Sequence, residues 1–355
     1  MKAFVMKGIG SVGFQEKPRP ECAPNEALVR TTKALVCTSD AHTVAGAIGE
    51  RNGLTLGHEA VGVVEDVGSL VRRIRPGDRV VVGAITPDWG DPASQMGHAS
   101  QSTGALGGWK FSNTKDGVFA EYFTVNEADA NLAVIPPEIS DEAAVYCSDM
   151  LSTGFAGAEG ARIPIGGTVA VFALGPVGLM AVAGARLRGA GRIVGVDPVR
   201  ARQELARSYG ATDIVDPSQG DAVAKILELT DGIGVDSAVE ALGAESTFAS
   251  AISATRPGGT ICNVGYHGHG DTIGIPRIGW GVGMAEKTIT SALCPGGSLR
   301  LERLLRVLSA QLVDPTLMTT HRFPFSQLDR AFAMMRDKTD GVIKPLIDFT
   351  TDLVR

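Results

Sequence analysis

The fold of this chain is decided by one stretch, TVAVFALGPVG at residues 168–178, which leads into a helical pattern over residues 179–188. A buried strand that enters a glycine-rich turn and then a helix is the opening unit of a dinucleotide-binding βαβ motif. Glycine lets the backbone approach a pyrophosphate, and the helix N-terminus offers free N–H groups. The first glycine of the G-x-G-x-x-G pattern is Ala173 here, so the turn by itself is a weak signal. The predicted pyrophosphate-binding residues are Gly175, Pro176, Val177 and Gly178.

The sequence after this turn strengthens the prediction. A second apolar run at residues 192–196 ends in Asp197, about twenty residues after the turn, as the dinucleotide motif requires. Short apolar runs follow at residues 213–215, 235–238 and 260–264, with helical patterns between most of them. This alternation indicates parallel strands joined by crossover helices, so we predict an α/β fold with a doubly wound parallel sheet.

Asp197 also bears on the choice of dinucleotide. A carboxylate at the end of the second strand accepts hydrogen bonds from the adenosine ribose hydroxyls and repels the 2′-phosphate of NADP. Arg200 and Arg202 argue the other way, since a nearby arginine can hold that phosphate, although both also fit as ordinary charges in the next helix. We predict NAD, with Arg202 among the cofactor-binding residues and NADP as the alternative.

Composition excludes several classes of function. The chain has 355 residues and a net charge of −6, without a Lys/Arg cluster, so we expect no nucleic-acid partner. Five scattered cysteines and no secretion signal favour thiols or metal ligands over disulfides. Residues 163–185 carry no charge, but Gly175 and Pro176 interrupt them, so we expect a strand and a helix and no membrane span. These features predict a cytoplasmic protein.

The first third of the chain has a different pattern. Short β-type segments at residues 26–31, 60–67, 78–82 and 119–125 alternate with turns, and a Gly-, Ser- and Thr-rich stretch at residues 88–112 is predicted to be a long loop. After residue 295, helical patterns at 301–312 and 328–336 precede a final strand near 342–347. We therefore predict three segments: a β-rich catalytic domain over 1–152, a dinucleotide domain over 153–294, and a return segment over 295–355 that completes the catalytic domain.

The β-rich part contains residues that suit a metal ion. Cys37, His58 and Asp149 offer a thiolate, an imidazole and a carboxylate, and three such ligands with an open fourth position make a catalytic zinc site. Each has a simpler explanation on its own, because a buried cysteine is usually a small apolar residue. In combination with a dinucleotide fold, the three predict a zinc-dependent oxidoreductase.

The sequence resembles the zinc-dependent medium-chain alcohol dehydrogenases over essentially its whole length. The stretch GHEAVGVVEDVG at residues 57–68, continuing to GDRV at 77–80, matches the zinc signature of that family. The segments ITPDW at 85–89, GWKFSN at 108–113, KDGVF at 115–119 and CPGG at 294–297 are similar to the bacterial and archaeal tetrameric secondary-alcohol dehydrogenases. The resemblance implies a GroES-like catalytic domain, a Rossmann domain, a small secondary alcohol or ketone as substrate, and a homotetramer.

The resemblance also implies a ligand set. Many members of the family place a cysteine four residues before a Thr-Gly pair, and this chain has Asp149 there, as the secondary-alcohol subgroup does. Cys147 is a rival ligand two residues away, but the fixed spacing favours Asp149. Glu59 is the usual exchanging or outer carboxylate beside His58.

This chain departs from the family pattern in two ways. The structural zinc of the family needs four closely spaced cysteines, and residues 88–112 contain none, which predicts one catalytic zinc per chain. The secondary-alcohol subgroup mostly uses NADP and reads its phosphate with Gly-Ser-Arg, where this chain has Asp197, Pro198 and Val199. The second departure agrees with the prediction of NAD.

The resemblance assigns roles to further residues. Ser39 would take the proton of the alcohol, and His42 would pass it outward. The implied cofactor contacts outside the turn are Thr38, Thr153, Gly265, Tyr266 and Lys344. The implied substrate pocket is lined by Ala84, Ile85, Trp109, Tyr266, Leu293 and Cys294. The alternatives are a polyol, threonine or primary-alcohol/aldehyde dehydrogenase on the same scaffold, or a zinc-free cofactor-binding protein of the quinone reductase type.

Overall fold

The computed structural model describes residues 1–102 and 115–351, and its contacts divide the chain into two units. Unit 1 consists of Met1–Ser152 and Cys294–Arg355, and unit 2 of Thr153–Leu293. Cys294 therefore lies in unit 1, one residue away from the predicted boundary. Helix α6 (Met150–Gly160) contains the first crossing between the units. Among the described residues, no helix is long and apolar enough to cross a membrane.

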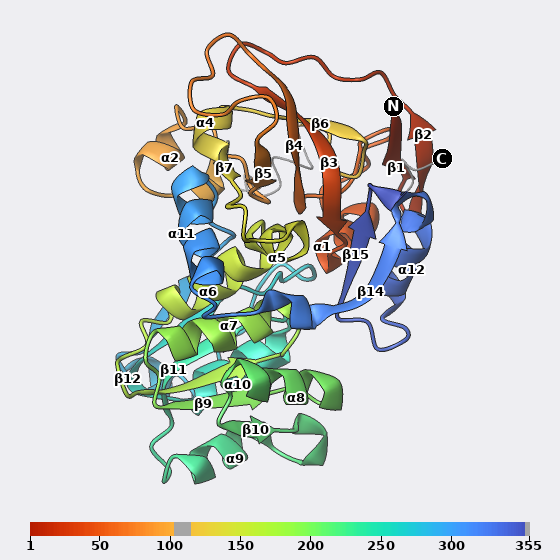
Figure 1. The fold of residues 1–355 in the computed structure, drawn as a ribbon. Coiled ribbons are helices and arrows are strands. Elements are labelled where there is room, and N and C mark those ends of the chain that lie inside the picture. The colour runs from red at the N-terminus through yellow and green to blue at the C-terminus, as the bar shows by residue number, and fades with distance from the viewer. Residues whose placement is uncertain (103–114, 352–355) are drawn as a thin grey trace. The chain divides into compact units, whose positions relative to one another are not determined.

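Unit 2 is built on a six-stranded parallel sheet in the order β10-β9-β8-β11-β12-β13 (Figure 1). Its strands are β8 (Thr168–Phe172), β9 (Arg192–Val196), β10 (Asp213–Val215), β11 (Val235–Glu240), β12 (Thr255–Asn263) and β13 (Thr288–Ser291). The connecting helices are α7 (Pro176–Leu187), α8 (Arg200–Tyr209), α9 (Ala222–Leu229) and α10 (Glu245–Ala254), with 3₁₀ turns at Pro217–Gln219 and Gly281–Gly283. The strand order reverses at β8, as in doubly wound folds, and this confirms the predicted fold class.

The core of unit 2 follows from the apolar runs in the sequence. Ala170, Val194 and Ala238 from three neighbouring strands pack in one buried cluster with Phe248 and Ile252 of α10. Strands that are covered by helices have to be apolar, which is why these runs carry so few charges.

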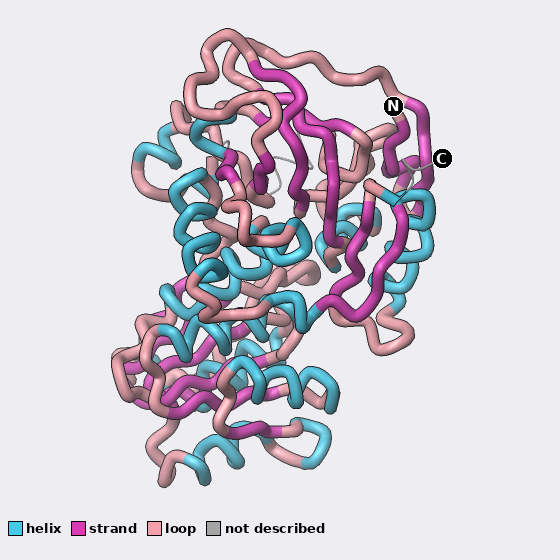
Figure 2. The backbone as a smooth tube through the Cα atoms, viewed as in Figure 1, coloured by secondary structure: helices cyan, strands magenta, loops and turns pink. Residues whose placement is uncertain are grey.

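Unit 1 holds a seven-stranded sheet and a separate β1–β2 hairpin. The path β14-β15-β3-β4-β5-β7 is antiparallel except for the β14–β15 pair, and β6 pairs with β3. Its strands are β1 (Lys2–Gly8), β2 (Ser11–Glu16), β3 (Ala27–Leu35), β4 (Ala60–Val67), β5 (Arg79–Val82), β6 (Tyr122–Val125), β7 (Leu132–Val134), β14 (Thr319–Pro324) and β15 (Lys344–Asp348). Figure 2 shows these strands in magenta.

The helices of unit 1 are short except for the two near its C-terminal end. They are α1 (Thr38–Val44), α2 (Pro92–Gln95), α4 (Ala128–Asn131), α5 (Asp141–Ala144), α11 (Ser298–Ser309) and α12 (Leu328–Asp337). Short 3₁₀ turns lie at Ala99–Gln101, Val145–Cys147, Pro315–Met318 and Phe325–Gln327. The returning segment contributes α12 and β15 to the buried core of the unit, with Leu328, Phe332 and Ile347 packed against Phe4 and Phe119.

Two local predictions differ from the structure. The predicted strand at 119–125 is divided, because Phe119 and Ala120 pair with the β1 strand and only Tyr122–Val125 pairs with β3. The predicted loop at 88–112 contains helix α2, which Asp91 caps by accepting a hydrogen bond from the Ala93 N–H at 2.8 Å. Residues 103–114 of that loop lie outside the described part of the chain.

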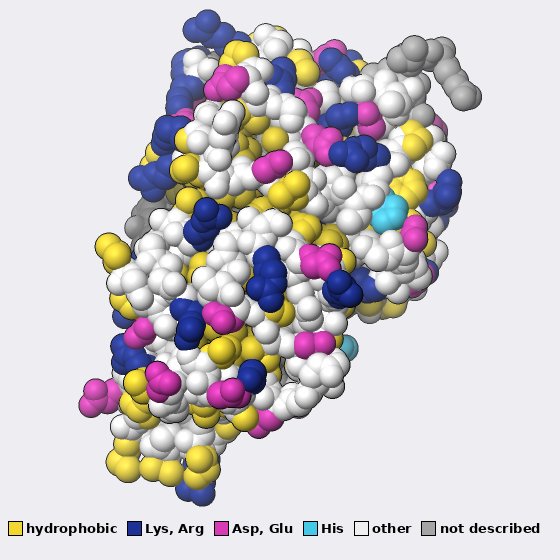
Figure 3. Space-filling view, turned by 60° about the horizontal axis from the view of Figure 1, so that its bottom comes forward, with side chains coloured by type: hydrophobic (Ala, Val, Ile, Leu, Met, Phe, Trp, Pro, Cys, Tyr) yellow, Lys and Arg dark blue, Asp and Glu magenta, His cyan; other side chains and the backbone are white. Residues whose placement is uncertain are grey.

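The surface carries charges of both signs. On the face shown in Figure 3, Lys and Arg side chains lie among Asp and Glu side chains. This mixture of charges matches the composition of the chain.

Candidate active site

Three of the predicted metal-site residues meet because of the register of β3 and β4. Ala34 pairs with Ala60, and the Leu35 N–H donates to the Glu59 carbonyl at 3.1 Å. Cys37 comes two residues after β3 ends, and His58 comes two residues before β4 begins. Antiparallel pairing therefore brings Cys37, His58 and Glu59 to the same end of the sheet.

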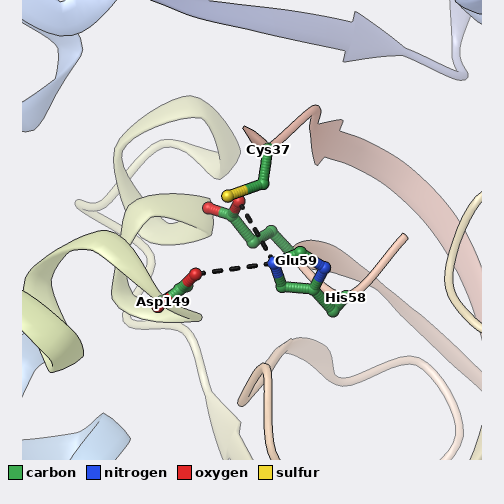
Figure 4. Close-up of side chains that lie close together, drawn as sticks. All are labelled: Cys37, His58, Glu59 and Asp149. Carbon is green, nitrogen blue, oxygen red and sulfur yellow. Dashed lines mark ion pairs between the residues drawn. The ribbon is translucent and has the colours of Figure 1, made fainter. Parts of the chain in front are cut away.

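Asp149 joins this group from another part of the chain. Its neighbour Ser148 accepts a hydrogen bond from the Ala84 N–H at 2.9 Å and donates its hydroxyl to the Ala60 carbonyl at 3.3 Å. Asp149 thereby comes within 3.5 Å of His58, from its Oδ2 to the imidazole Nε2 (Figure 4). One potential ligand atom from each of Cys37, His58, Glu59 and Asp149 lies within 4.8 Å of all the others, and all four residues are buried.

Asp40 belongs to this site although the sequence analysis did not assign it a role. Its Oδ2 accepts from the Cys37 N–H at 2.8 Å, which caps helix α1, and its Oδ1 lies 3.1 Å from His58 Nδ1. A hydrogen bond from Nδ1 to a carboxylate leaves Nε2 as the metal-binding nitrogen and orients the ring. Cys37 and Asp40 form a helix capping box with the usual three-residue spacing, but they are not its usual residue types, so the sequence signal was weak.

Lys344 forms an ion pair within the candidate metal cluster. It is the first residue of β15, which pairs with β3, and its Nζ donates to Glu59 Oε1 at 2.6 Å. Both side chains are completely buried. Burial would lower the pKa of the Lys344 ammonium, but the negative groups of Cys37 and Glu59 outweigh it and raise that pKa. The structure thus places Lys344 at the candidate metal cluster, and its contact with the cofactor stays a prediction.

The electrostatics of the cluster favour a thiolate. Burial alone would raise the pKa of the Cys37 thiol, but the Lys344 ammonium and a hydrogen bond with His58 lower it to about 7 from an ordinary value of 9.0. A thiol ligand has to be deprotonated to bind a metal, so this environment prepares Cys37 for that role.

These residues fit a zinc ion by two observations. The donor set of one sulfur, one imidazole nitrogen and one carboxylate is the mixture that catalytic zinc accepts. Glu59 Oε2 is buried and has no hydrogen-bond partner, which leaves a carboxylate oxygen in the cluster available to a cation. Cys147, the rival ligand, is not in the cluster, and burial raises the pKa of its thiol.

The residues predicted to move the proton lie on helix α1. The Ser39 hydroxyl is 3.2 Å from the Cys37 sulfur. His42 lies three residues further along the same helix, so both can project from one face of it. Thr38, a predicted cofactor contact, accepts a hydrogen bond from the Lys338 ammonium at 2.6 Å.

The structure brings together the predicted pocket residues that lie in unit 1. Ala84 and Ile85 are buried after β5, and the Cys294 sulfur is 3.5 Å from the Ser148 carbonyl, which also binds the Ala84 N–H. A Cβ on Gly296 would lie 2.3 Å from the Ile85 carbonyl, so the glycine after Pro295 permits this close approach. Trp109 lies outside the described residues.

The glycine-rich turn in unit 2 has room for a ligand at one glycine and none at the other. A Cβ on Gly178 would lie 1.9 Å from the Ala173 carbonyl, so only glycine allows helix α7 to start so close to β8. A Cβ on Gly175 would meet no atom within 4 Å, which leaves open space in front of the helix N-terminus. Ala173 replaces the first glycine of the motif at a left-handed φ of +69°. Pro176 and Val177 form the first turn of α7.

Asp197 holds the turn and the end of β9 together. Its two oxygens accept from the Leu174 and Val199 N–H groups, each at 2.8 Å, and the Arg202 guanidinium lies 3.7 Å away. Asp197 and Arg202 line a cavity of about 380 Å³ within unit 2, together with Ala173 and Leu242. This cavity is of a size that small-molecule sites have.

The remaining predicted cofactor and pocket residues of unit 2 lie after β12 and at the two ends of the unit. Gly265 and Tyr266 follow β12 and lie against Gly243, whose Cβ would meet the Tyr266 carbonyl at 2.2 Å. Thr153 is buried in α6, and Leu293 follows β13. Glu240 organises the neighbouring loop by accepting from the Gly243 N–H at 3.0 Å, a role that the sequence analysis did not identify.

A buried cluster of residues that could hold a zinc ion in a β-rich unit, together with a glycine-rich strand–helix turn in a doubly wound unit, is the arrangement of a zinc-dependent dehydrogenase. The chain belongs to the zinc-dependent medium-chain alcohol dehydrogenases. Family models described as "Alcohol dehydrogenase GroES-like domain" and "Zinc-binding dehydrogenase" match residues 23–137 and 176–310.

Full-length relatives support this membership. A protein of Thermoanaerobacter brockii, described as an NADP-dependent isopropanol dehydrogenase, is 53% identical over 98% of this chain and 99% of its own length. A protein of Entamoeba histolytica with the same description is 52% identical over 98% of this chain and 95% of its own length. An alcohol dehydrogenase of Cupriavidus necator is 41% identical over 97% of both chains.

Among solved structures, the alcohol dehydrogenase TADH from Thermus sp. ATN1 matches with a TM-score of 0.88 and 29% identity. The match covers 98% of this chain and 99% of that chain. The predicted family and its GroES-like and Rossmann domains are therefore confirmed.

Proposed function

We propose that this protein interconverts a small secondary alcohol and its ketone with NAD as the hydride carrier and one zinc ion held by Cys37, His58 and Asp149. The observation that carries the proposal is the buried cluster of these ligands, which is linked to the buried apolar residue Ala84 by the hydrogen bond from the Ala84 N–H to the carbonyl of Ser148, the neighbour of Asp149. The relatives described as isopropanol dehydrogenases support a secondary alcohol as the substrate.

Each residue has a definite task in this reaction. A zinc ion, when bound, is a Lewis acid that lowers the pKa of an alcohol hydroxyl toward neutrality. Ser39, whose hydroxyl lies 3.2 Å from the Cys37 sulfur, takes the proton, and His42 passes it outward. Asp40 orients His58. The Lys344 ammonium compensates the negative charge of the buried Glu59 carboxylate next to the ligands.

The placement of the Asp197 carboxylate supports NAD over NADP. The Asp197 carboxylate is fixed by two backbone N–H groups in the cavity after β9, so it cannot rotate away from a ligand without breaking both bonds. A 2′-phosphate placed there would face this negative charge, whereas ribose hydroxyls would donate to it. The isopropanol dehydrogenase relatives are described as NADP-dependent, so we expect this chain to differ from them in its cofactor.

The test is a set of initial rates with 2-propanol and 2-butanol, measured with NAD and with NADP at matched concentrations. We expect a clear preference for NAD and oxidation of both alcohols. Activity with NADP alone would overturn the assignment of Asp197 and leave the reaction in place. Activity restricted to polyols, threonine or primary alcohols would overturn the substrate class.

We propose a homotetramer as the assembly. Strand β13 is the edge strand of the unit 2 sheet. The segment that precedes it in the sequence exposes five large apolar side chains. These are Ile273, Ile275, Ile278, Val282 and Met284. Such a surface beside a sheet edge is typical of subunit contacts. Light scattering on the eluting protein would give the mass, and a monomer would contradict the proposal.

A further inference from the structure

Asp149 is held differently from the other two zinc ligands. Cys37 and His58 each lie two residues from the paired strands β3 and β4, whereas Asp149 adjoins no strand and comes between a 3₁₀ turn ending at Cys147 and helix α6. Its position therefore depends on the contacts of the residues on either side of it. Ser148 and Ser152 are both completely buried, and both make hydrogen bonds to distant parts of unit 1.

On the N-terminal side, Ser148 is tied to the sheet. Its hydroxyl donates to the Ala60 carbonyl at 3.3 Å, and its carbonyl accepts from the Ala84 N–H at 2.9 Å. These contacts bring the backbone before Asp149 to the sheet, but they leave the direction of the following helical turn open.

On the C-terminal side, the contacts come from an arginine in the returning segment. The Arg300 guanidinium donates from Nε to the Ser152 hydroxyl oxygen at 3.1 Å and from its second terminal nitrogen to the Ser152 carbonyl at 2.8 Å. The Ser152 hydroxyl in turn donates to the Pro295 carbonyl at 2.8 Å. Arg300 thus binds Ser152 through two donors, and Ser152 lies three residues after Asp149.

We propose that Arg300 is a positioning residue for the zinc centre, which acts through Ser152 to fix the turn that presents Asp149. A guanidinium is suited to this task because its planar donors can bind two acceptors in a set direction, which a lysine ammonium does not do. Arg300 acts on the metal site through its two hydrogen bonds to Ser152 and the backbone between Ser152 and Asp149. Residues that orient metal ligands in this way commonly change metal affinity about 10- to 100-fold when they are replaced. The inference rests on the proposed role of Asp149 as a zinc ligand.

The test uses the full-length chain and compares Arg300→Met with Arg300→Lys and Ser152→Ala. Arg303→Met is the matched control, because Arg303 is exposed on the same helix α11. Two quantities are measured for each variant: zinc affinity, by competition with a chelator, and the visible absorption of the cobalt-substituted protein, which reports the ligand geometry. Denaturant unfolding is measured alongside, so that a loss of fold is separated from a change at the metal.

We expect Arg300→Met and Ser152→Ala to weaken zinc binding about 10- to 100-fold and to alter the cobalt spectrum. Arg300→Lys should lie between them and the wild type, and Arg303→Met should match the wild type. Should Arg300→Met fail to fold, Ser152→Ala, which removes one hydroxyl, decides the question.

The outcomes separate this inference from the proposed function. If the wild type binds zinc, Asp149→Asn loses it, and both Arg300→Met and Ser152→Ala keep the wild-type affinity and spectrum, the positioning role of Arg300 is wrong. If Asp149→Asn itself keeps the wild-type affinity and spectrum, the ligand assignment in the proposed function is wrong, and this inference is wrong with it.

Discussion

The glycine-rich turn of unit 2, proposed to bind the dinucleotide, and the proposed metal centre of unit 1 are built in opposite ways. The turn uses a continuous segment from β8 to Asp197, and most of its contacts involve backbone groups. The metal centre collects Cys37, His58, Asp149 and Lys344 from four distant segments, and its contacts involve buried side-chain charges. A local sequence pattern specifies the first site, and the register of a sheet specifies the second.

This difference predicts unequal consequences of mutation. In the metal centre, replacing one charged group leaves its partner buried without compensation, which is costly. At the turn, the Asp197 carboxylate accepts from two neutral backbone N–H groups, so replacing it with a neutral acceptor leaves no completely buried charge behind. Substitutions in unit 1 should therefore have larger effects than substitutions at the turn of unit 2.

The largest effect is expected for Cys37→Ser. A metal Lewis acid contributes several kcal/mol to transition-state stabilisation, so loss of the zinc should lower kcat/KM on the order of 10³-fold or more. Zinc content per chain and alcohol oxidation are measured together. Cys147→Ser is the control and should keep both its zinc and its activity. Loss of zinc from the control but not from Cys37→Ser would reverse the ligand assignment.

Next in size is Lys344→Met, which leaves the Glu59 carboxylate buried without its cation. Breaking a buried pair by removing one partner commonly costs about 3–5 kcal/mol of unfolding free energy. Urea unfolding checks this value. Lys225→Met in unit 2 removes one partner of an exposed pair with Glu228 and should cost less than about 1 kcal/mol. Equal losses of unfolding free energy in the two variants would contradict the prediction that the buried pair of Lys344 costs more to break than the exposed pair of Lys225.

A smaller change is expected for Asp40→Asn. The substitution keeps the size of the side chain but removes the negative charge that orients His58. Zinc affinity should fall about 10- to 100-fold, as measured by chelator competition. Asp66→Asn, on the exposed part of β4, is the control. Unchanged affinity in Asp40→Asn would mean that the sheet alone orients His58.

The smallest effect is expected at the turn. Asp197→Asn removes the charge while keeping an acceptor, so NAD binding should weaken about tenfold, in line with the loss of a charge-assisted hydrogen bond worth about 1.5 kcal/mol. NADP binding should improve because the repulsion of its phosphate is removed. Glu204→Gln, exposed on α8, should change neither affinity. A larger loss here than in Asp40→Asn would contradict the ranking of the two regions.

The sequence predicted the parallel sheet well because its strands are buried on both faces. The predicted strands at 192–196 and 213–215 have the bounds of β9 and β10. The edge strand β13, with half-buried polar residues, carries no such apolar pattern and was not predicted. The division of 119–125 between two partner strands also could not be predicted, because pairing depends on distant residues.

Prediction of the metal site from the sequence was limited in the same way, by contacts between distant residues. The ligand types and spacing pointed to Cys37, His58 and Asp149, which the structure brings together. The partner of Lys344 depends on the register of β15 against β3, across about 300 residues of sequence, and no local pattern encodes it. Arg300 and Ser152 are separated by a whole unit in the sequence, so their contact likewise required the fold.

The most direct test of this account is the rate of 2-propanol oxidation with NAD before and after treatment with a zinc chelator, followed by return of zinc. We expect activity that falls with the loss of about one zinc per chain and recovers when zinc is restored. Full activity in protein that contains no metal would contradict it.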